Sequence, residues 1–143
     1  MRGTGLALAA AAMLAGGLPA LAGQQFFPAS PSGYIEFVMP SNNVGCIYTP
    51  AGGSSVYVPA DGGPELQCDR VAPSYLRFIL SASGPAQVIS DVADASCCGS
   101  ANVFAYGNTW KAGPYVCKSA TTGLTCSRGA HGFRISKANI KAY

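Results

Sequence analysis

The chain has 143 residues, of which 49% are apolar and only 10% are charged, and its formal net charge is +3. These values exclude intrinsic disorder, which requires low hydrophobicity together with high net charge. They also argue against a nucleic-acid groove, because the densest basic stretch is the short tail at residues 128–141. The length suits one small domain.

The first predicted element is a cleavable N-terminal signal helix over residues 1–22. Arg2 supplies the positive start, residues 6–18 are uncharged and rich in alanine and leucine, and Ala20-Leu21-Ala22 forms a small-x-small cleavage site. The apolar stretch is shorter than the ~20 residues that cross a bilayer. We therefore expect an exported protein, periplasmic or secreted, whose mature form begins near Gly23 and has no membrane span.

After this segment we expect a short N-terminal extension at residues 23–36 and a single β-rich domain at residues 37–143. Short β-branched and aromatic runs alternate with glycine-rich turns, which predicts an all-β fold, either a small antiparallel sandwich or a barrel. The runs are 34–39, 44–49, 54–58, 65–70, 75–80, 86–90, 102–105, 115–119, 124–128 and 133–136. The tail at residues 138–143 fits either a helical turn or a last strand.

All six cysteines follow the predicted cleavage site: Cys46, Cys68, Cys97, Cys98, Cys117 and Cys126. An even number of cysteines in an exported chain indicates a fold stapled by disulfides. Cys117 and Cys126 flank Ala120-Thr121-Thr122-Gly123, which suits a four-residue hairpin loop and places the two cysteines opposite each other. We expect Cys46 to pair with Cys68. Cys97 and Cys98 then pair with each other or stay reduced, unless one of them pairs elsewhere.

Candidate catalytic chemistry is sparse. The Cys97-Cys98 pair permits a redox role, but no Cys-x-x-Cys motif accompanies it. The cysteine spacing and the single histidine do not suit zinc, and nothing indicates a cofactor. His131 is the most natural general base near neutral pH, yet no Gly-x-Ser-x-Gly nucleophile motif is present. No two carboxylates stand out by their spacing. The sequence therefore favours a protein that is not an enzyme.

An aromatic-rich stretch surrounds the predicted hairpin and offers either a binding platform or core packing, of which core packing is favoured. It contains Phe104, Tyr106, Trp110, Tyr115 and Phe133. If the stretch is exposed, the candidate binding residues are Tyr106, Trp110, Tyr115 and His131.

Residues 37–46 (FVMPSNNVGC) match the pattern F-x-S-P-S-G-N-I-G-C in part. A closer match, to Y-G-x-x-W … C-x-S-x-x-x-G-L-T-C … G-H-G-F-x-x-S, begins at Tyr106 and ends at Ser136. With these motifs the chain resembles a family of small exported bacterial proteins known only as a domain of unknown function. The chain lacks the C-x-x-D-W-G that this family carries after the Cys68 equivalent, so the resemblance implies that the usual partner of the cysteine near position 97 is missing. The resemblance implies a secreted, β-rich disulfide domain and names no activity.

We expect an exported soluble protein that acts as a non-catalytic binding or structural module. Its expected partner is an extracytoplasmic macromolecule or glycan, not a nucleic acid. One alternative is an inhibitor of an extracellular hydrolase, because a cross-linked β-scaffold can hold a loop rigid for insertion into an active site. The other alternative is an enzyme that uses His131 or the Cys97-Cys98 pair.

Overall fold

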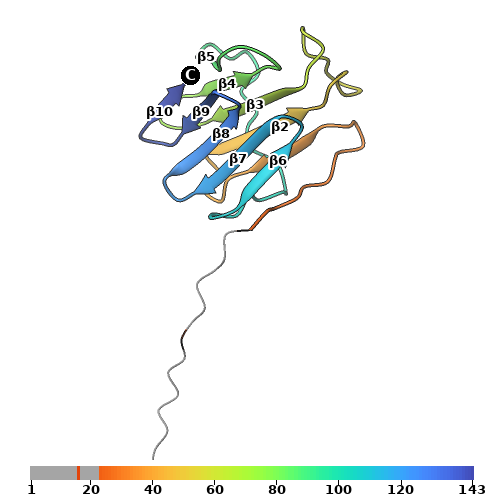
Figure 1. Ribbon diagram of the computed structural model, residues 1–143. Helices are drawn as coiled ribbons and strands as arrows, with labels where there is room; N and C mark the ends of the chain where they lie inside the picture. Colours follow the sequence, from red (N-terminus) through yellow and green to blue (C-terminus); the bar gives the residue numbers. More distant parts are fainter. Residues whose placement is uncertain (1–15, 17–22) are drawn as a thin grey trace, which may run out of the picture.

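The computed structural model describes residue 16 and residues 23–143, so the predicted signal helix lies outside the described residues except for Gly16. The described part contains two antiparallel sheets of five strands and no helix (Figure 1). It therefore contains no helix that is long and apolar enough to cross a membrane. The all-β prediction is confirmed, and the two layers form a sandwich rather than a barrel.

Each sheet is a meander in which strands adjacent in sequence are also adjacent in space. The N-terminal sheet contains β1 (Ile35–Val38), β2 (Val44–Thr49), β3 (Glu65–Arg70), β4 (Leu76–Leu80) and β5 (Gln87–Ile89). The C-terminal sheet contains β6 (Thr109–Ala112), β7 (Tyr115–Ala120), β8 (Gly123–Arg128), β9 (His131–Ile135) and β10 (Ile140–Ala142). Consecutive strands joined by short turns produce this order, because such strands pair most readily with each other.

Three elements differ from the sequence-based prediction. Residues 54–58 form a turn, in which the Ser54 amide donates to the Tyr57 carbonyl at 2.8 Å, so local turn bonds override the β-branched composition. Residues 102–105 make only an isolated bridge between Val103 and Val38. Strand β6 was not predicted, because its four residues end at a Gly-Pro turn and carry little alternation.

The predicted extension is part of the packed fold. Gln24 bridges to Thr109 at the β6 edge of the C-terminal sheet. The Phe27 ring stacks on Phe37, with 5.3 Å between the ring centroids. Strand β1 begins at Ile35, inside the segment assigned to the extension.

The core lies between the sheets and is rich in aromatic rings. Leu76, Phe78 and Leu80 point inward, as the alternation of β4 predicts, and all three are buried. Aromatic contacts join the layers: the centroid of Phe37 lies 5.0 Å from that of Trp110, and Phe78 lies 5.5 Å from Phe133. Burying each of these side chains stabilises the fold by roughly 1.5–3 kcal/mol.

Disulfides join all six cysteines. Cys46 pairs with Cys68 across β2 and β3, and Cys117 pairs with Cys126 across β7 and β8, which confirms both predicted pairs. Cys97 and Cys98 pair with each other in the connection between β5 and β6, so of the alternatives left open the vicinal bridge is the one formed.

Candidate functional site

Two of the four predicted binding residues belong to the core. Trp110 and Tyr115 are 1% and 0% exposed, because the alternation of β6 and β7 turns both rings inward. The Tyr115 hydroxyl donates to the Pro64 carbonyl at 2.7 Å, and burial raises the pKa of Tyr115 to about 12. These rings join the sheets and do not form a binding platform.

His131 lies at the start of a strand in the C-terminal sheet. It begins β9 opposite Arg128 and is half-buried. It lines none of the three cavities of the described residues, and it is not part of the Asp69–Arg77 ion pair. The structure therefore does not place a general base beside a nucleophile at this position.

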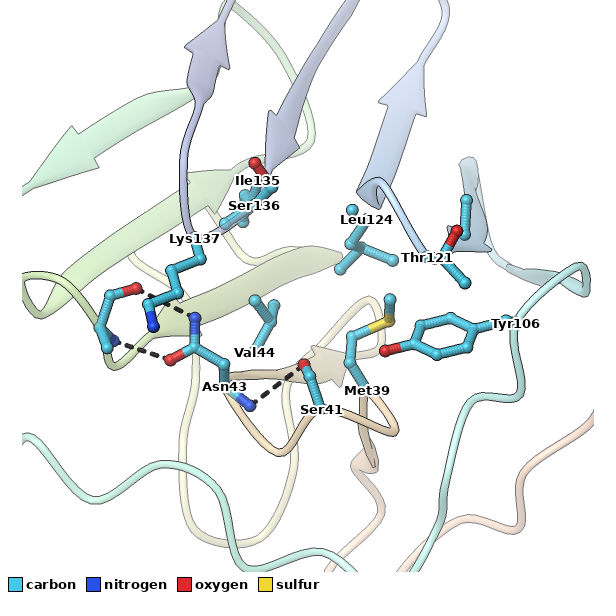
Figure 2. Close-up of a pocket in the computed structure, with 13 residues that line it drawn as sticks. Met39, Ser41, Asn43, Val44, Tyr106, Thr121, Leu124, Ile135, Ser136 and Lys137 are labelled. Carbon is cyan, nitrogen blue, oxygen red and sulfur yellow. Dashed lines mark hydrogen bonds between the residues drawn. The ribbon is translucent and has the colours of Figure 1, made fainter.

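Tyr106 is exposed and lines a cavity of about 410 Å³ at one end of the sandwich, which we call the end cavity (Figure 2). Both sheets contribute to it through the β1–β2 turn, the β7–β8 turn and the end of β9. Its floor is apolar and consists of Met39, Val44, Leu124 and Ile135. Its rim is polar and includes Ser41, Asn43, Tyr106, Thr121, Ser136 and Lys137.

Hydrogen bonds fix the walls of the end cavity. The Asn43 side chain donates to the Ala72 carbonyl at 3.0 Å and accepts from the Ala72 amide at 2.8 Å, which ties the β1–β2 turn to the β3–β4 loop. On the opposite wall, the Cys117–Cys126 disulfide braces the hairpin that carries Thr121 and Leu124. A site with walls held in this way needs little ordering when a ligand binds.

The end cavity is electropositive. The lining of the end cavity has one charged residue, Lys137, and contains no carboxylate. Behind Ser136, the buried guanidinium of Arg70 donates to the Ser136 carbonyl at 3.2 Å and to the Ser74 hydroxyl at 3.1 Å. The described residues contain one ion pair, between Asp69 and Arg77. No carboxylate of the described residues therefore forms an ion pair with Arg70 or Lys137.

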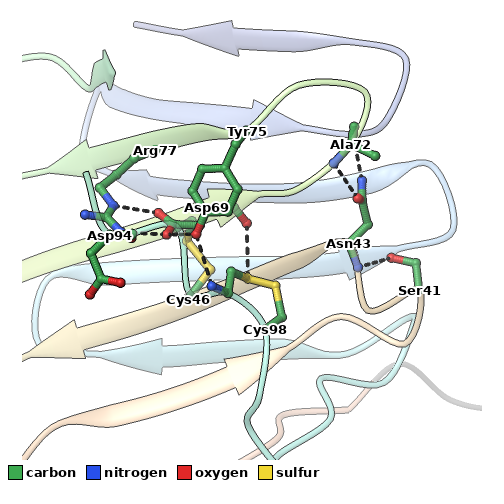
Figure 3. The surroundings of a disulfide bond; sticks show 11 residues. Ser41, Asn43, Cys46, Asp69, Ala72, Tyr75, Arg77, Asp94 and Cys98 are labelled. Atoms are coloured by element: carbon green, nitrogen blue, oxygen red, sulfur yellow. Dashed lines mark hydrogen bonds and ion pairs between the residues drawn. A yellow bond between two sulfur atoms is a disulfide. The ribbon is translucent and has the colours of Figure 1, made fainter. Parts of the chain in front are cut away.

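A second cavity, of about 440 Å³, lies on the outer face of the N-terminal sheet. Figure 3 shows the disulfide and the hydrogen-bonded side chains beside it. There Asp69 is buried and accepts from the Tyr75 hydroxyl at 2.6 Å and from two nitrogens of Arg77, each at 2.8 Å. Burial raises the pKa of Tyr75, and its hydrogen bond to Asp69 raises that pKa further. Because this carboxylate already accepts three bonds, it is a structural anchor and not an available base.

The same network holds the Cys97–Cys98 pair against the sheet. The Cys97 amide donates to the Tyr75 hydroxyl at 3.1 Å, and Arg77 donates to the Asp94 carbonyl at 3.0 Å. The two sulfur atoms lie over Gly45 in β2. The vicinal pair therefore has a clear packing role: it seats the β5–β6 connection on the N-terminal sheet.

A third cavity, of about 390 Å³, adjoins the second and shares Ile47, Gln67 and Arg77 with it. Its buried carboxylate, Glu65, accepts from the Tyr57 hydroxyl at 3.0 Å. Burial raises the pKa of Glu65, while the bond from Tyr57 acts in the opposite direction. No group of three or more His, Cys, Asp or Glu side chains suited to a metal ion is present in the described part of the chain.

Comparisons of the chain with protein-family models, with curated proteins and with solved structures found no match.

Sequence reasoning found one residue of the end cavity, Tyr106, and missed the rest of its polar rim. Asn43 carries a local signal, since it lies in a Ser-Asn-Asn turn between two predicted strands. Lys137 carries none, because it meets the rim only when the ends of the two sheets come together.

Proposed function

We propose that the protein is an exported, non-catalytic binding module whose ligand site is the end cavity. The observation that carries this proposal is a cavity of about 410 Å³ with an apolar floor, a polar rim and hydrogen-bonded walls. This volume lies within the range of roughly 300–1,000 Å³ that small-molecule sites occupy, and the combination of floor and rim is typical of such sites.

The ligand chemistry follows from the lining. The four apolar floor residues favour an aliphatic or aromatic body of modest size. Lys137 on the rim, with Arg70 buried behind Ser136, favours a carboxylate or another anionic group at one end of that body. The lining contains neither a histidine nor a carboxylate that could move a proton, which supports binding rather than turnover.

The test is an NMR titration of the isotope-labelled protein with small aryl and alkyl carboxylates. We expect the amide resonances of residues 39, 41–44, 121–124 and 135–137 to shift together as ligand is added. Replacing Lys137 by alanine should weaken binding by about ten- to a hundredfold, because a charge-assisted hydrogen bond contributes roughly 1.5–3 kcal/mol.

Gln87→Ala is the control, since Gln87 is an exposed polar residue on β5 outside the end cavity. It should bind the same carboxylates as the unaltered protein does. The proposal fails if the amides around the end cavity do not respond. It also fails if the protein turns over a substrate and His131→Asn abolishes that turnover without unfolding the chain.

A second candidate function is inhibition of an extracellular hydrolase, and the loop between β2 and β3 favours it. Val56, Tyr57 and Val58 at this loop are 69%, 47% and 59% exposed. The loop projects beyond the sheets at the upper right of Figure 1. Consecutive exposed apolar side chains on a projecting loop are suited to the pocket of a partner.

The base of this loop is held in place. The Gly52 amide donates to the Gly62 carbonyl at 2.8 Å, and the Tyr57 hydroxyl is bonded to Glu65. The Cys46–Cys68 disulfide joins the two strands that carry the loop. Such restraint lowers the ordering cost of insertion into an active site.

A panel of secreted proteases and lysozymes tests this second candidate. We expect one member to be inhibited, and the inhibition to be lost in Tyr57→Ala. It should be retained in Phe26→Ala, which removes an exposed aromatic ring at a distant position in the sequence. Unchanged rates across the whole panel would remove the candidate.

A further inference from the structure

The two halves of the folded chain carry opposite charge. All six acidic residues of the chain lie between Glu36 and Asp94, where the only basic residues are Arg70 and Arg77, so residues 23–108 carry a net charge of −4. Residues 109–143 contain no acidic side chain and six basic ones, which are Lys111, Lys118, Arg128, Arg134, Lys137 and Lys141. Because residues 109–143 form the C-terminal sheet, that sheet is positively charged.

The strand register aligns three of these cations in one row. Thr109 pairs with Lys118, Lys118 with Thr125, Thr125 with Arg134, and Arg134 with Lys141. The neighbouring inner row contains the buried Trp110, Cys117, Cys126 and Phe133, so the row of cations lies on the outer face. We call it the basic row. It crosses all five strands of the sheet, which run from cyan (β6) to dark blue (β10) in Figure 1.

A fourth cation extends the same face. Lys111 lies two residues after Thr109 on β6, so its side chain is on the same outer face. It belongs to a parallel row, in which Lys111 pairs with Val116, Val116 with Ser127, and Ser127 with Gly132. Lys111, Lys118, Arg134 and Lys141 are all exposed, and none of them is part of the Asp69–Arg77 ion pair that the described residues contain. The Lys141 ammonium lies 5.7 Å from the centre of the Tyr143 ring. The face therefore carries positive charge without an acidic partner.

We propose that the basic row binds a linear acidic polysaccharide that lies across the strands. Neighbouring strands are ~4.8 Å apart, so five strands extend the row over roughly 19 Å. Thr109 and Thr125 alternate with the cations, so hydroxyl donors and acceptors stand beside the charges. A polyuronate presents the complementary set, with carboxylates and hydroxyls along one chain.

Three other occupants fit this face less well. A second copy of the protein would need a matching acidic face, but the exposed acids Asp61, Asp91 and Asp94 lie on loops. An anionic bilayer favours several apolar and aromatic side chains beside the cations. This face offers few large apolar groups, namely Tyr143 and the half-buried Val116. Single-stranded nucleic acid favours stacking aromatic rings along the path of the strand, and the basic row contains none.

The test is isothermal titration of the disulfide-intact protein with polygalacturonate. We expect binding to polygalacturonate and none to the neutral polysaccharide dextran. The affinity should fall as the salt concentration rises, because the contacts are ionic. Replacing Lys118 or Arg134 by glutamine should weaken binding about fivefold for each charge removed, by analogy with basic residues at charged surfaces.

Thr125→Glu is the decisive variant, because it places a carboxylate directly between Lys118 and Arg134. Opposite charges that pair across strands stabilise a sheet, so this variant should melt no lower than the unaltered protein while losing affinity for polygalacturonate. Thr122→Glu is its matched control: it makes the same charge change at an exposed turn outside the row and should retain binding.

Several results would overturn the proposal. The first is the absence of polygalacturonate binding at low salt, and the second is equal binding by Thr125→Glu and Thr122→Glu. Binding to phosphatidylglycerol vesicles or to DNA at least as tight as to polygalacturonate would assign the face to another partner. Sedimentation of the protein as a concentration-dependent oligomer that Thr125→Glu disperses would assign it to a second copy of the chain.

Discussion

At Gly45, the absence of a Cβ atom allows the β5–β6 connection to lie on the N-terminal sheet. A Cβ built at this position would lie 2.8 Å from the Cys97 sulfur and 3.1 Å from the Cys98 sulfur. Gly99 in the same region has nothing within 4 Å of such an atom. Gly45 is therefore tightly packed against the disulfide, whereas Gly99 has room for a side chain.

Gly45→Ala should destabilise the protein by roughly 1–3 kcal/mol, because the vicinal disulfide must move away from the added methyl group. Gly99→Ala, the control, should change the free energy of unfolding by less than about 0.5 kcal/mol. Urea denaturation of both variants measures the difference. Equal stabilities would show that the sulfur atoms do not rest on β2.

Tyr115 gives the stability a dependence on alkaline pH. Its pKa is about 12 in the folded protein against an ordinary value of 10.0. As the pH rises above 10, the unfolded chain loses this proton while the folded chain keeps it, so the free energy of unfolding falls. Between pH 10 and pH 12 the loss is about 2 kcal/mol by this linkage.

Tyr115→Phe should cost about 1 kcal/mol near neutral pH, because the hydrogen bond to the Pro64 carbonyl is lost. The stability difference between this variant and the unaltered protein should then narrow above pH 10 and reverse by about pH 12, since phenylalanine has no proton to lose. Denaturation curves recorded across that pH range are the check. A difference that stays constant with pH would contradict the burial of this hydroxyl.

At the scale of the strands, alternation and turn chemistry predicted much of the fold. Strands β2 and β3 have the predicted bounds, and the β7–β8 hairpin has the predicted register. The hairpin ladder extends to Ala120 and Gly123, which leaves Thr121 and Thr122 as the loop instead of the four predicted residues. Gly123 has a φ of 135°, a conformation that favours glycine and permits this tighter turn.

The cross-strand disulfides should each contribute about 3 kcal/mol. The chain-entropy relation gives ~3.4 kcal/mol for the longer loop closed by Cys46 and Cys68, and ~2.7 kcal/mol for the loop closed by Cys117 and Cys126. Replacing each pair by two alanines and measuring the free energy of unfolding tests both values and their order. A double variant as stable as the unaltered protein would contradict the bracing role of that bridge.

For the whole molecule, the closing of two sheets creates what the sequence alone cannot predict. The end cavity joins the β1–β2 turn to the end of β9, positions almost a hundred residues apart in the chain. The basic row depends on the register of five strands, whereas in sequence its cations are spread from Lys118 to Lys141 and interrupted by Arg128 and Lys137, which are not in the row. Burial also decided the role of the aromatic residues, because Trp110 and Tyr115 fill the core and Tyr106 does not.

The central claim is that the chain works outside the cytosol as an oxidised β-sandwich braced by three disulfides. Mass mapping of peptides from the non-reduced protein, purified from its native exported fraction, tests this claim most directly. The account predicts an N-terminus near Gly23 and the cross-links Cys46–Cys68, Cys97–Cys98 and Cys117–Cys126. An intact chain that begins at Met1 and carries six titratable thiols would contradict it.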